Sequence, residues 1–229
     1  MRPITFSFPT ITQNEICATQ FTTATDQSLL INGSLAVVNA KGQYPYALAP
    51  GIQRPVAIFS TGNIETSTFT ITGYDCRATG LLSTTLIGPT GTATQTQTTT
   101  EFNRVVSVTV GAVSLATFTV GFGASGSTNW VNPNKFQDPF NVTISVANVG
   151  TGAPITVQDT PLDLNVTAPT AAFTYNHTVL ATITTATQSN YQMPVTYMRA
   201  IFTATRSTAA NSTATVGPSV VFQQAGSGA

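Results

Sequence analysis

Apolar and small polar residues alternate with a period of two along much of the chain, which is typical of strands with one face in a core. The opening ITFSF shows this pattern, and Gly, Pro and Asn interrupt it at short intervals. It predicts strands at 4–8, 28–39 (two short strands), 54–61, 67–73, 80–88, 101–111, 115–123, 138–150, 154–160, 193–205 and 212–224. No stretch predicts a helix of three or more turns, and Thr-rich residues 171–184 favour at most a short helical turn.

The turn residues predict how some of these strands are joined. Asn32-Gly33 is a dipeptide typical of tight hairpins, so we expect a short strand on each side of it. The strands at 54–61 and 67–73 are expected to pair through Gly62-Asn63. The sequence GASGST at 123–128 predicts a flexible linker.

Short strands at regular spacing predict an all-β fold of two antiparallel β-sandwich or jelly-roll-like domains with an N-terminal arm. The expected division is an arm with the first strand at 1–27, one sandwich at 28–124 and a second at 125–229. The arm carries Ile4, Phe6, Phe8 and Ile11, and we expect it to add a strand to the sheet edge of a neighbouring molecule.

The charge of the chain is low and balanced. Charged residues make up 7% of the sequence, with eight basic and eight acidic side chains, while hydrophobic residues make up 41%. This balance argues against nucleic acid or an acidic membrane as a partner. A neutral, Thr-rich surface gives little repulsion between molecules, so we expect an assembly to cover much of it, with a soluble monomer as the alternative. The first residues lack the apolar core of a signal peptide, and no apolar run is as long as a membrane span.

One cluster of reactive residue types, Tyr74, Asp75, Cys76 and Arg77, lies between two alternating runs. A cysteine nucleophile needs a base nearby, and the single histidine, His177, is in the other half of the chain. Turn residues such as Asp bond their own backbone, so the cluster predicts a hairpin corner. Cys17 and Cys76 would form one disulfide or, as we favour, remain two free thiols.

The carboxylates are scattered, and only Asp159 and Asp163 are close enough to share a loop. Their sequence QDTPLD favours a turn over a calcium or magnesium site. One histidine and two separated cysteines do not make a zinc site, and GFGASG at 121–126 lacks the Lys and the following helix of a phosphate loop. We therefore expect no catalytic residue, no metal and no cofactor, although a glycosidase-type carboxylate pair is not excluded.

Trp130 is the single tryptophan and follows the predicted linker. It is expected to pack one domain onto the other or onto a partner. With the four apolar residues of the arm, it completes the set of candidate interaction residues.

Residues 54–123 resemble a domain that recurs in structural proteins of tailed bacteriophages. The motifs of that domain follow here in the same order: R-x-V at 54–56, G-N at 62–63, F-T-I-T-G-x-D at 69–75, the strand ending in G-P at 87–89, and F with V-x-S-V at 102–108. The preceding LLINGSLAV at 29–37 is similar to the opening L-T-L-N-G of the same domain.

Residues 138–205 resemble small phage virion proteins. The matching motifs are P-F-N-V at 139–142, T-V-Q-D at 156–159 followed by Asp163, Tyr175 with His177, and P-V at 194–195 followed by Arg199. Tyr175 stands where Trp is frequent in those proteins, and TQSN at 187–190 replaces their usual Asp-Gly.

This resemblance implies a virion structural protein without enzymatic activity, in which His177 and the residues QDT at 158–160 anchor the fold. The expected function is that of a capsid decoration or cement protein on the virion surface. Its partners would be the major capsid protein and copies of itself, forming a homo-oligomer, with no nucleic acid and no membrane. The alternatives are a tail or head-fibre component, a carbohydrate-binding β-sandwich that uses Tyr44, Tyr46 and Tyr191, and a polysaccharide depolymerase.

Overall fold

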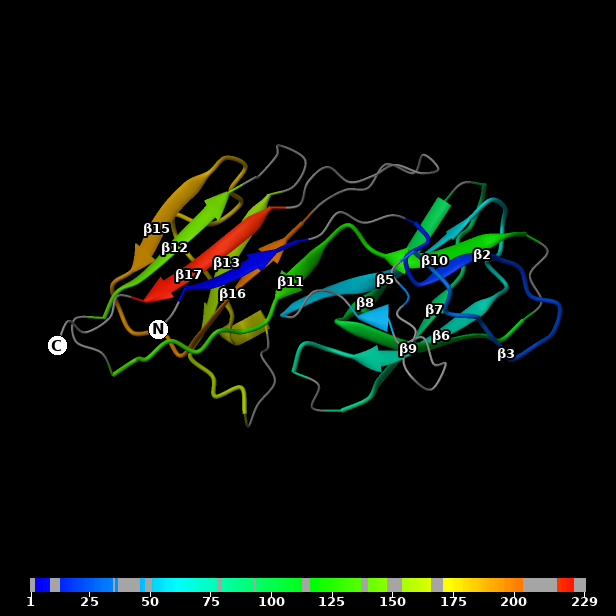
Figure 1. Cartoon of the computed structure of the whole chain (residues 1–229), viewed down its shortest axis with the longest axis horizontal. Coiled ribbons are helices and arrows are strands. Elements are labelled where there is room, and N and C mark those ends of the chain that lie inside the picture. The colour runs from blue at the N-terminus through cyan, green and yellow to red at the C-terminus, as the bar shows by residue number, and fades with distance from the viewer. Residues whose placement is uncertain are drawn as a thin grey trace. The chain divides into compact units, whose positions relative to one another are not determined.

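The computed structural model confirms an all-β, antiparallel fold (Figure 1). It describes residues 3–8, 13–34, 36, 46–47, 51–77, 80–92, 94–112, 116–136, 140–147, 154–165, 171–203 and 218–224. Within these ranges the one helical element is the short 3-10 helix η1 (Ala171–Phe173), which lies where a helical turn is expected.

The strands are β1 (Ile4–Ser7), β2 (Cys17–Gln20), β3 (Gln27–Ser28), β4 (Tyr46–Ala47), β5 (Ile52–Ser60), β6 (Thr68–Tyr74), β7 (Leu82–Ile87), β8 (Thr94–Phe102), β9 (Arg104–Val110), β10 (Phe118–Phe122), β11 (Gly126–Thr128), β12 (Val142–Ala147), β13 (Ile155–Thr160), β14 (Tyr175–Asn176), β15 (Thr187–Tyr191), β16 (Tyr197–Phe202) and β17 (Ser219–Gln224).

The chain forms two compact units. Unit 1 contains Met1–Pro9, Ser127–Thr205 and Val216–Ala229, and unit 2 contains Thr10–Gly126 and Arg206–Thr215. The division between the units falls inside β11. The first nine residues, however, belong with the C-terminal unit and not with residues 10–27.

Unit 2 contains two groups of hydrogen-bonded strands. One runs β8-β5-β10-β2, and the other runs β3-β9-β6-β7 with β4 also on β9. Phe69 of β6 and Phe118 of β10 meet edge to face with their ring centroids 5.1 Å apart, so the two groups share an apolar core. Both phenylalanines are buried, as are Ile58 and Val108.

Two expected pairings in unit 2 are wrong. Strand β5 pairs with β8 and β10, whereas β6 pairs with β7 and β9, so the segment at Gly62-Asn63 joins different strand groups and makes no hairpin. Asn32-Gly33 is not a hairpin turn either. The N–H of Gly33 donates to the carbonyl of Ile16 at 2.9 Å, and a Cβ on Gly33 would lie 2.2 Å from the carbonyl carbon of Glu15. Glycine is needed here because two backbone segments approach closely.

The predicted linker at 123–128 is largely buried, and its last three residues form β11. A Cβ on Gly126 would lie 2.7 Å from Cγ of Arg54, and a Cβ on Gly123 would lie 2.7 Å from Cγ of Pro55. These glycines therefore permit close packing, and the flexible-linker interpretation is wrong.

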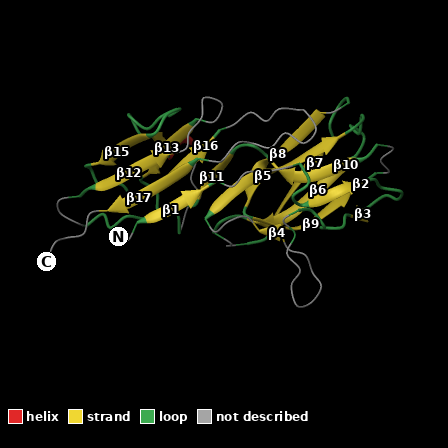
Figure 2. Cartoon of the chain, turned by 45° about the horizontal axis from the view of Figure 1, so that its top comes forward, coloured by secondary structure: helices red, strands yellow, loops and turns green. Residues whose placement is uncertain are grey.

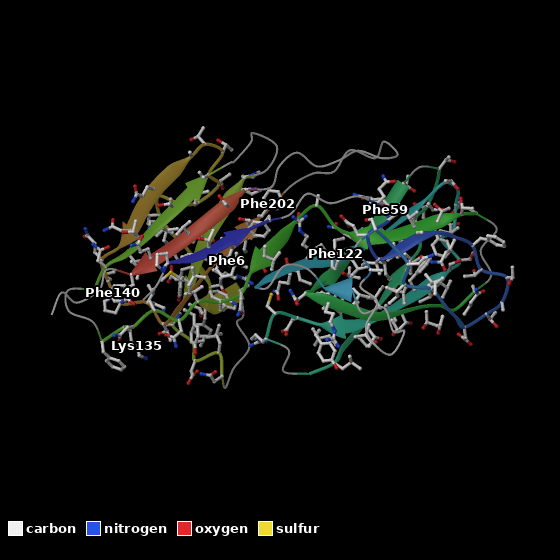
Figure 3. All side chains as sticks on the ribbon, viewed as in Figure 1. Phe6, Phe59, Phe122, Lys135, Phe140 and Phe202 are labelled. Atoms are coloured by element: carbon white, nitrogen blue, oxygen red, sulfur yellow. The ribbon has the colours of Figure 1, made fainter. Side chains whose placement is uncertain are left out.

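Unit 1 contains one group of strands in the order β1-β17-β12-β15 and a second containing β14-β13-β16 (Figure 2). Phe8, just after β1, lies against Phe202 of β16 with ring centroids 5.2 Å apart, and Phe6 of β1 meets Phe222 of β17 edge to face at 6.0 Å; Figure 3 labels Phe6 and Phe202 in this unit. Alternate residues of β12 and β13, among them Ile144 and Val157, are buried, as their period-two pattern predicts.

Candidate functional site: an interaction surface

The arm residues that sequence analysis selects for a partner contact lie in the fold of their own chain. Strand β1 pairs antiparallel with β17, with Ile4 opposite Phe222 and Phe6 opposite Val220. Phe6 and Phe8 are 7% and 1% exposed, and Phe8 also donates its backbone N–H to Pro218. The segment therefore completes a sheet of unit 1 within its own chain. Ile11 lies outside the described residues.

Trp130, the fifth candidate, is half-buried in unit 1. The guanidinium carbon of Arg199 lies 4.5 Å from the centre of its ring, which is a cation–π contact. Arg199 in turn donates from Nε and Nη2 to Oε1 of Gln158, and Nε2 of Gln158 donates to Oδ1 of Asn176. Trp130 thus packs on the strands of its own unit, at one end of a row of polar side chains across β16, β13 and β14.

The cluster Tyr74–Arg77 is the corner between β6 and β7, as the sequence predicts. Oδ1 of Asp75 accepts the backbone N–H of Arg77 at 2.9 Å, and its Oδ2 lies 3.5 Å from Nε of Arg77. The backbone N–H of Cys76 donates to the side-chain oxygen of Gln53. These polar groups hold the corner together.

Both cysteines are free thiols, Cys17 buried and Cys76 half-buried. Burial raises the pKa of each thiol from 9.0 to about 12, and the charges of Asp75 and Glu101 act in the same direction on Cys76. A thiol with such a pKa stays protonated near neutral pH and is a poor nucleophile.

His177 is a structural cap in unit 1. Its Nδ1 accepts the backbone N–H groups of Val179 and Leu180, both at 3.1 Å, and its Nε2 lies 3.4 Å from the carbonyl oxygen of Asn190. The imidazole is 7% exposed and stands edge to face on Tyr191, with ring centroids 4.5 Å apart. The ring nitrogens are therefore occupied by the backbone.

Tyr191 donates its hydroxyl hydrogen to Oδ1 of Asp159 at 2.9 Å, beside the ring of His177. Burial raises the pKa of Asp159, while the bond from Tyr191 and the nearness of His177 partly lower it. Burial and the Asp159 charge raise the pKa of Tyr191. Asp163, by contrast, caps its own turn by accepting the N–H of Asn165, so the two carboxylates of QDTPLD have separate local roles.

The described part of the chain holds no group of three His, Cys, Asp or Glu side chains arranged to bind a metal ion. No helix within it has the length and apolar character needed to cross a membrane.

The most exposed large apolar side chain of the described residues is Phe136, at 86%. It ends a loop of unit 1, residues 131–136, which we call the Phe136 loop. The ammonium of Lys135 lies 5.5 Å from the centre of the Phe136 ring, and Figure 3 shows Lys135 on this loop. An open depression of about 410 Å³ lies beside it, lined by Asn132, Pro133, Asn134, Lys135, Phe136 and Gln224.

The Phe136 loop is fastened to the strands at several points. Val131 and Met198 exchange backbone hydrogen bonds at 2.7 and 2.9 Å. Gln224 at the end of β17 is 2% exposed, and its amide accepts the N–H of Asn134 and donates to the carbonyl of Asn134, both at 2.8 Å. Oδ1 of Asn134 accepts the N–H of Phe136 at 3.2 Å. The loop therefore holds an aromatic side chain in water on a fixed backbone.

Sequence reasoning did not select Phe136. The stretch NPNKF at 132–136 has turn residues followed by a cation and a single Phe, which indicates a loop. The sequence does not show that this Phe is exposed, because the chain has 13 phenylalanines and phenylalanine is usually a core residue.

Comparison of the chain with family models, curated proteins and solved structures finds no match.

Proposed function

We propose that this chain is a non-enzymatic structural protein of a virus particle, and specifically a decoration protein that binds the capsid surface. It would stabilise the shell by bridging copies of the major capsid protein and of itself. The resemblance of residues 54–123 and 138–205 to phage structural proteins supports this setting. The arrangement of the polar residues supports the absence of catalysis, because His177, Asp75 and Asp163 hydrogen-bond to nearby backbone groups.

The single observation that carries the proposal is the Phe136 loop. Exposing a phenyl ring to water is unfavourable, by about 2 kcal/mol relative to burial. Here the buried Gln224 and the side chain of Asn134 fix the backbone that presents the ring. An aromatic side chain on a fixed backbone loses less entropy on binding than one on a mobile loop, and exposed aromatic side chains of this kind are common among the interface residues that contribute most to affinity.

The test is binding of the purified chain to shells that lack it, followed by heating of bare and decorated particles. We expect saturable binding at the stoichiometry of the shell subunits and a higher disruption temperature. Phe136→Ser should weaken binding by about tenfold or more, the effect of losing one strong interface residue. Met193→Ser is the matched control, because Met193 is also apolar, is 78% exposed and belongs to unit 1.

Three results would contradict parts of this proposal. Binding to a tail complex and not to shells would place the protein in the tail. Binding to a glycan array without binding to shells would favour a carbohydrate-binding module. Equal binding by wild type and Phe136→Ser would remove the Phe136 loop from the interface.

A further inference from the structure

Strand β7 lies at one end of its strand group in unit 2 and pairs on one side with β6. Among the described residues no strand pairs with its other side. An open strand edge presents backbone N–H and C=O groups that readily pair with another chain, so proteins protect such edges. The protection of β7 can therefore be compared with that of the other edges.

The ladder bonds show which groups of β7 point away from β6. Gly88 donates its N–H to the carbonyl of Ser67, which makes these two residues a hydrogen-bonded pair. Such pairs alternate along an antiparallel ladder, so the next bonded pairs are Phe69 with Leu86, Ile71 with Thr84, and Gly73 with Leu82. The backbone groups of Ser83, Thr85 and Ile87 consequently point outward. Oγ1 of Thr96 donates to the Ile87 carbonyl at 2.9 Å, which agrees with this direction and occupies that end. Strand β8 therefore runs close to this end of β7, and Ser83 and Thr85 are the outward positions with which no described strand pairs.

The usual edge protection is missing from β7. Its sequence LSTTLI contains no charge, no proline and no glycine, and its register with β6 is uninterrupted. The edge strand β8 has an irregular register with β5 and carries Glu101, and β2 has an irregular register with β10. At β15 the carbonyl of Asn190 faces Nε2 of His177. Strand β7 is thus the longest regular edge of the described residues without such a device.

The sequence of β7 is complementary to itself in the antiparallel direction. LSTTL at 82–86 reads nearly the same both ways. With a two-fold axis at Thr84, Ser83 faces Thr85 of the second copy and Leu82 faces its Leu86. Ser83 and Thr85 carry the outward backbone groups, so the hydrogen bonds would form in the two symmetry-related pairs of Ser83 with Thr85, and not between the leucines. Leu82 and Leu86 are half-buried at the edge, where the leucines of a second copy would cover them.

We propose that the outer edge of β7 is a self-association site, at which β7 of a second copy adds antiparallel about this two-fold axis. The contact is isologous, since each copy supplies the same residues. It lacks charge, so no like-charge repulsion opposes the pairing of identical strands. The contact is small, so the dissociation constant is expected between about 10 µM and 1 mM, and the dimer is expected to form at high local concentration.

The test uses the full-length chain by itself, without shells, so its result does not depend on the proposed function. Sedimentation velocity from about 10 to 500 µM should show a concentration-dependent dimer. Thr85→Pro removes an N–H that β6 does not use, so the sheet should stay intact while the dimer weakens by tenfold or more. Thr85→Val keeps the N–H and is the matched control.

Hydrogen exchange gives a second readout. In wild type, the amides of Ser83 and Thr85 should become protected as the concentration rises, whereas the amide of Leu86, bonded to β6, should not change. A wild type that stays monomeric throughout, or a dimer that persists unchanged in a folded Thr85→Pro variant, would overturn the proposal. So would a Thr85→Val variant that loses the dimer as completely as Thr85→Pro, because the side chain and not the edge would then be responsible.

Discussion

The His177 cap leads to a prediction that separates two contributions to the stability of unit 1. Nδ1 of His177 accepts two backbone N–H groups, and the ring packs on Tyr191. Oδ1 of an asparagine occupies the same place as Nδ1, because both atoms are bonded to Cγ. His177→Asn therefore keeps the acceptor and loses the ring. His177→Phe keeps a ring and loses the acceptor, and His177→Ala loses both.

The expected magnitudes follow from these contacts. Two backbone hydrogen bonds contribute about 2 kcal/mol, at about 1 kcal/mol net for each. The edge-to-face contact with Tyr191 contributes about 1 kcal/mol. We expect His177→Asn to lower the free energy of unfolding of unit 1 by about 1 kcal/mol, His177→Phe by about 2 and His177→Ala by about 3.

The assay is urea unfolding followed by tryptophan fluorescence. Trp130 is the only tryptophan in the chain and lies in unit 1, so its emission reports this unit and not unit 2. Hydrogen exchange of the Val179 and Leu180 amides checks the cap directly, and both should exchange faster in His177→Phe than in His177→Asn. Equal destabilisation by Asn and Ala, with equal exchange rates, would refute the assignment of His177 as a cap.

Three further predictions concern strain and burial. Gly33→Ala should destabilise unit 2 by about 2 kcal/mol or more in a denaturant titration, because its Cβ would lie 2.2 Å from the backbone of Glu15; a neutral effect would contradict that close approach. Thr182 has a φ of 58°, which is strained for a β-branched residue, so Thr182→Gly should stabilise unit 1 by about 1 kcal/mol by Trp130 fluorescence. The pKa of Cys17 rises from 9.0 to about 12 on folding, so its stabilisation is complete below pH 9 and is lost towards pH 12, by about 1.4 kcal/mol per pH unit. Cys76 has the same shift, so unfolding measured from pH 8.5 to 11 should show about twice this slope in wild type, and Cys17→Ala should lose about half of it.

Strands with one apolar face were predictable from the sequence. In β12 and in the first half of β13 every second residue is buried, so the sequence itself alternates between apolar and polar residues. Strand β8 was missed because TQTQTTT alternates two polar residues, and only the β propensity of threonine indicates a strand there. The corner at Asp75 and the 3-10 helix η1 were also predictable, since both depend on local sequence.

The partners of the strands were not predictable, because pairing is set by contacts distant in the chain. Strand β1 joins β17 across almost the whole sequence, which turned a predicted arm into part of a sheet. Strands β5 and β6 are neighbours in sequence but lie in different strand groups. The glycines at 123 and 126 are typical of a linker in the sequence, and only the folded structure shows that Pro55 and Arg54 pack closely against them. The exposure of Phe136 and the open edge of β7 depend on the same non-local packing.

The use of charge in unit 2 bears on how this protein would bind. Glu15 and Arg54 are each 1% exposed. Oε2 of Glu15 accepts the N–H of Phe122 at 2.9 Å, and Nη1 of Arg54 donates to the carbonyls of Gly123 and Ala124. One of the eight acidic and one of the eight basic side chains therefore bind the same backbone segment, residues 122–124. The remaining surface has no net charge to draw a partner from a distance, so association should proceed at about 10⁵–10⁶ M⁻¹s⁻¹ with little dependence on salt. Affinity must then come from contacts made after encounter. The two proposed surfaces would supply two kinds of contact that need little charge: an exposed aromatic side chain on the Phe136 loop and the outward backbone groups of the β7 edge.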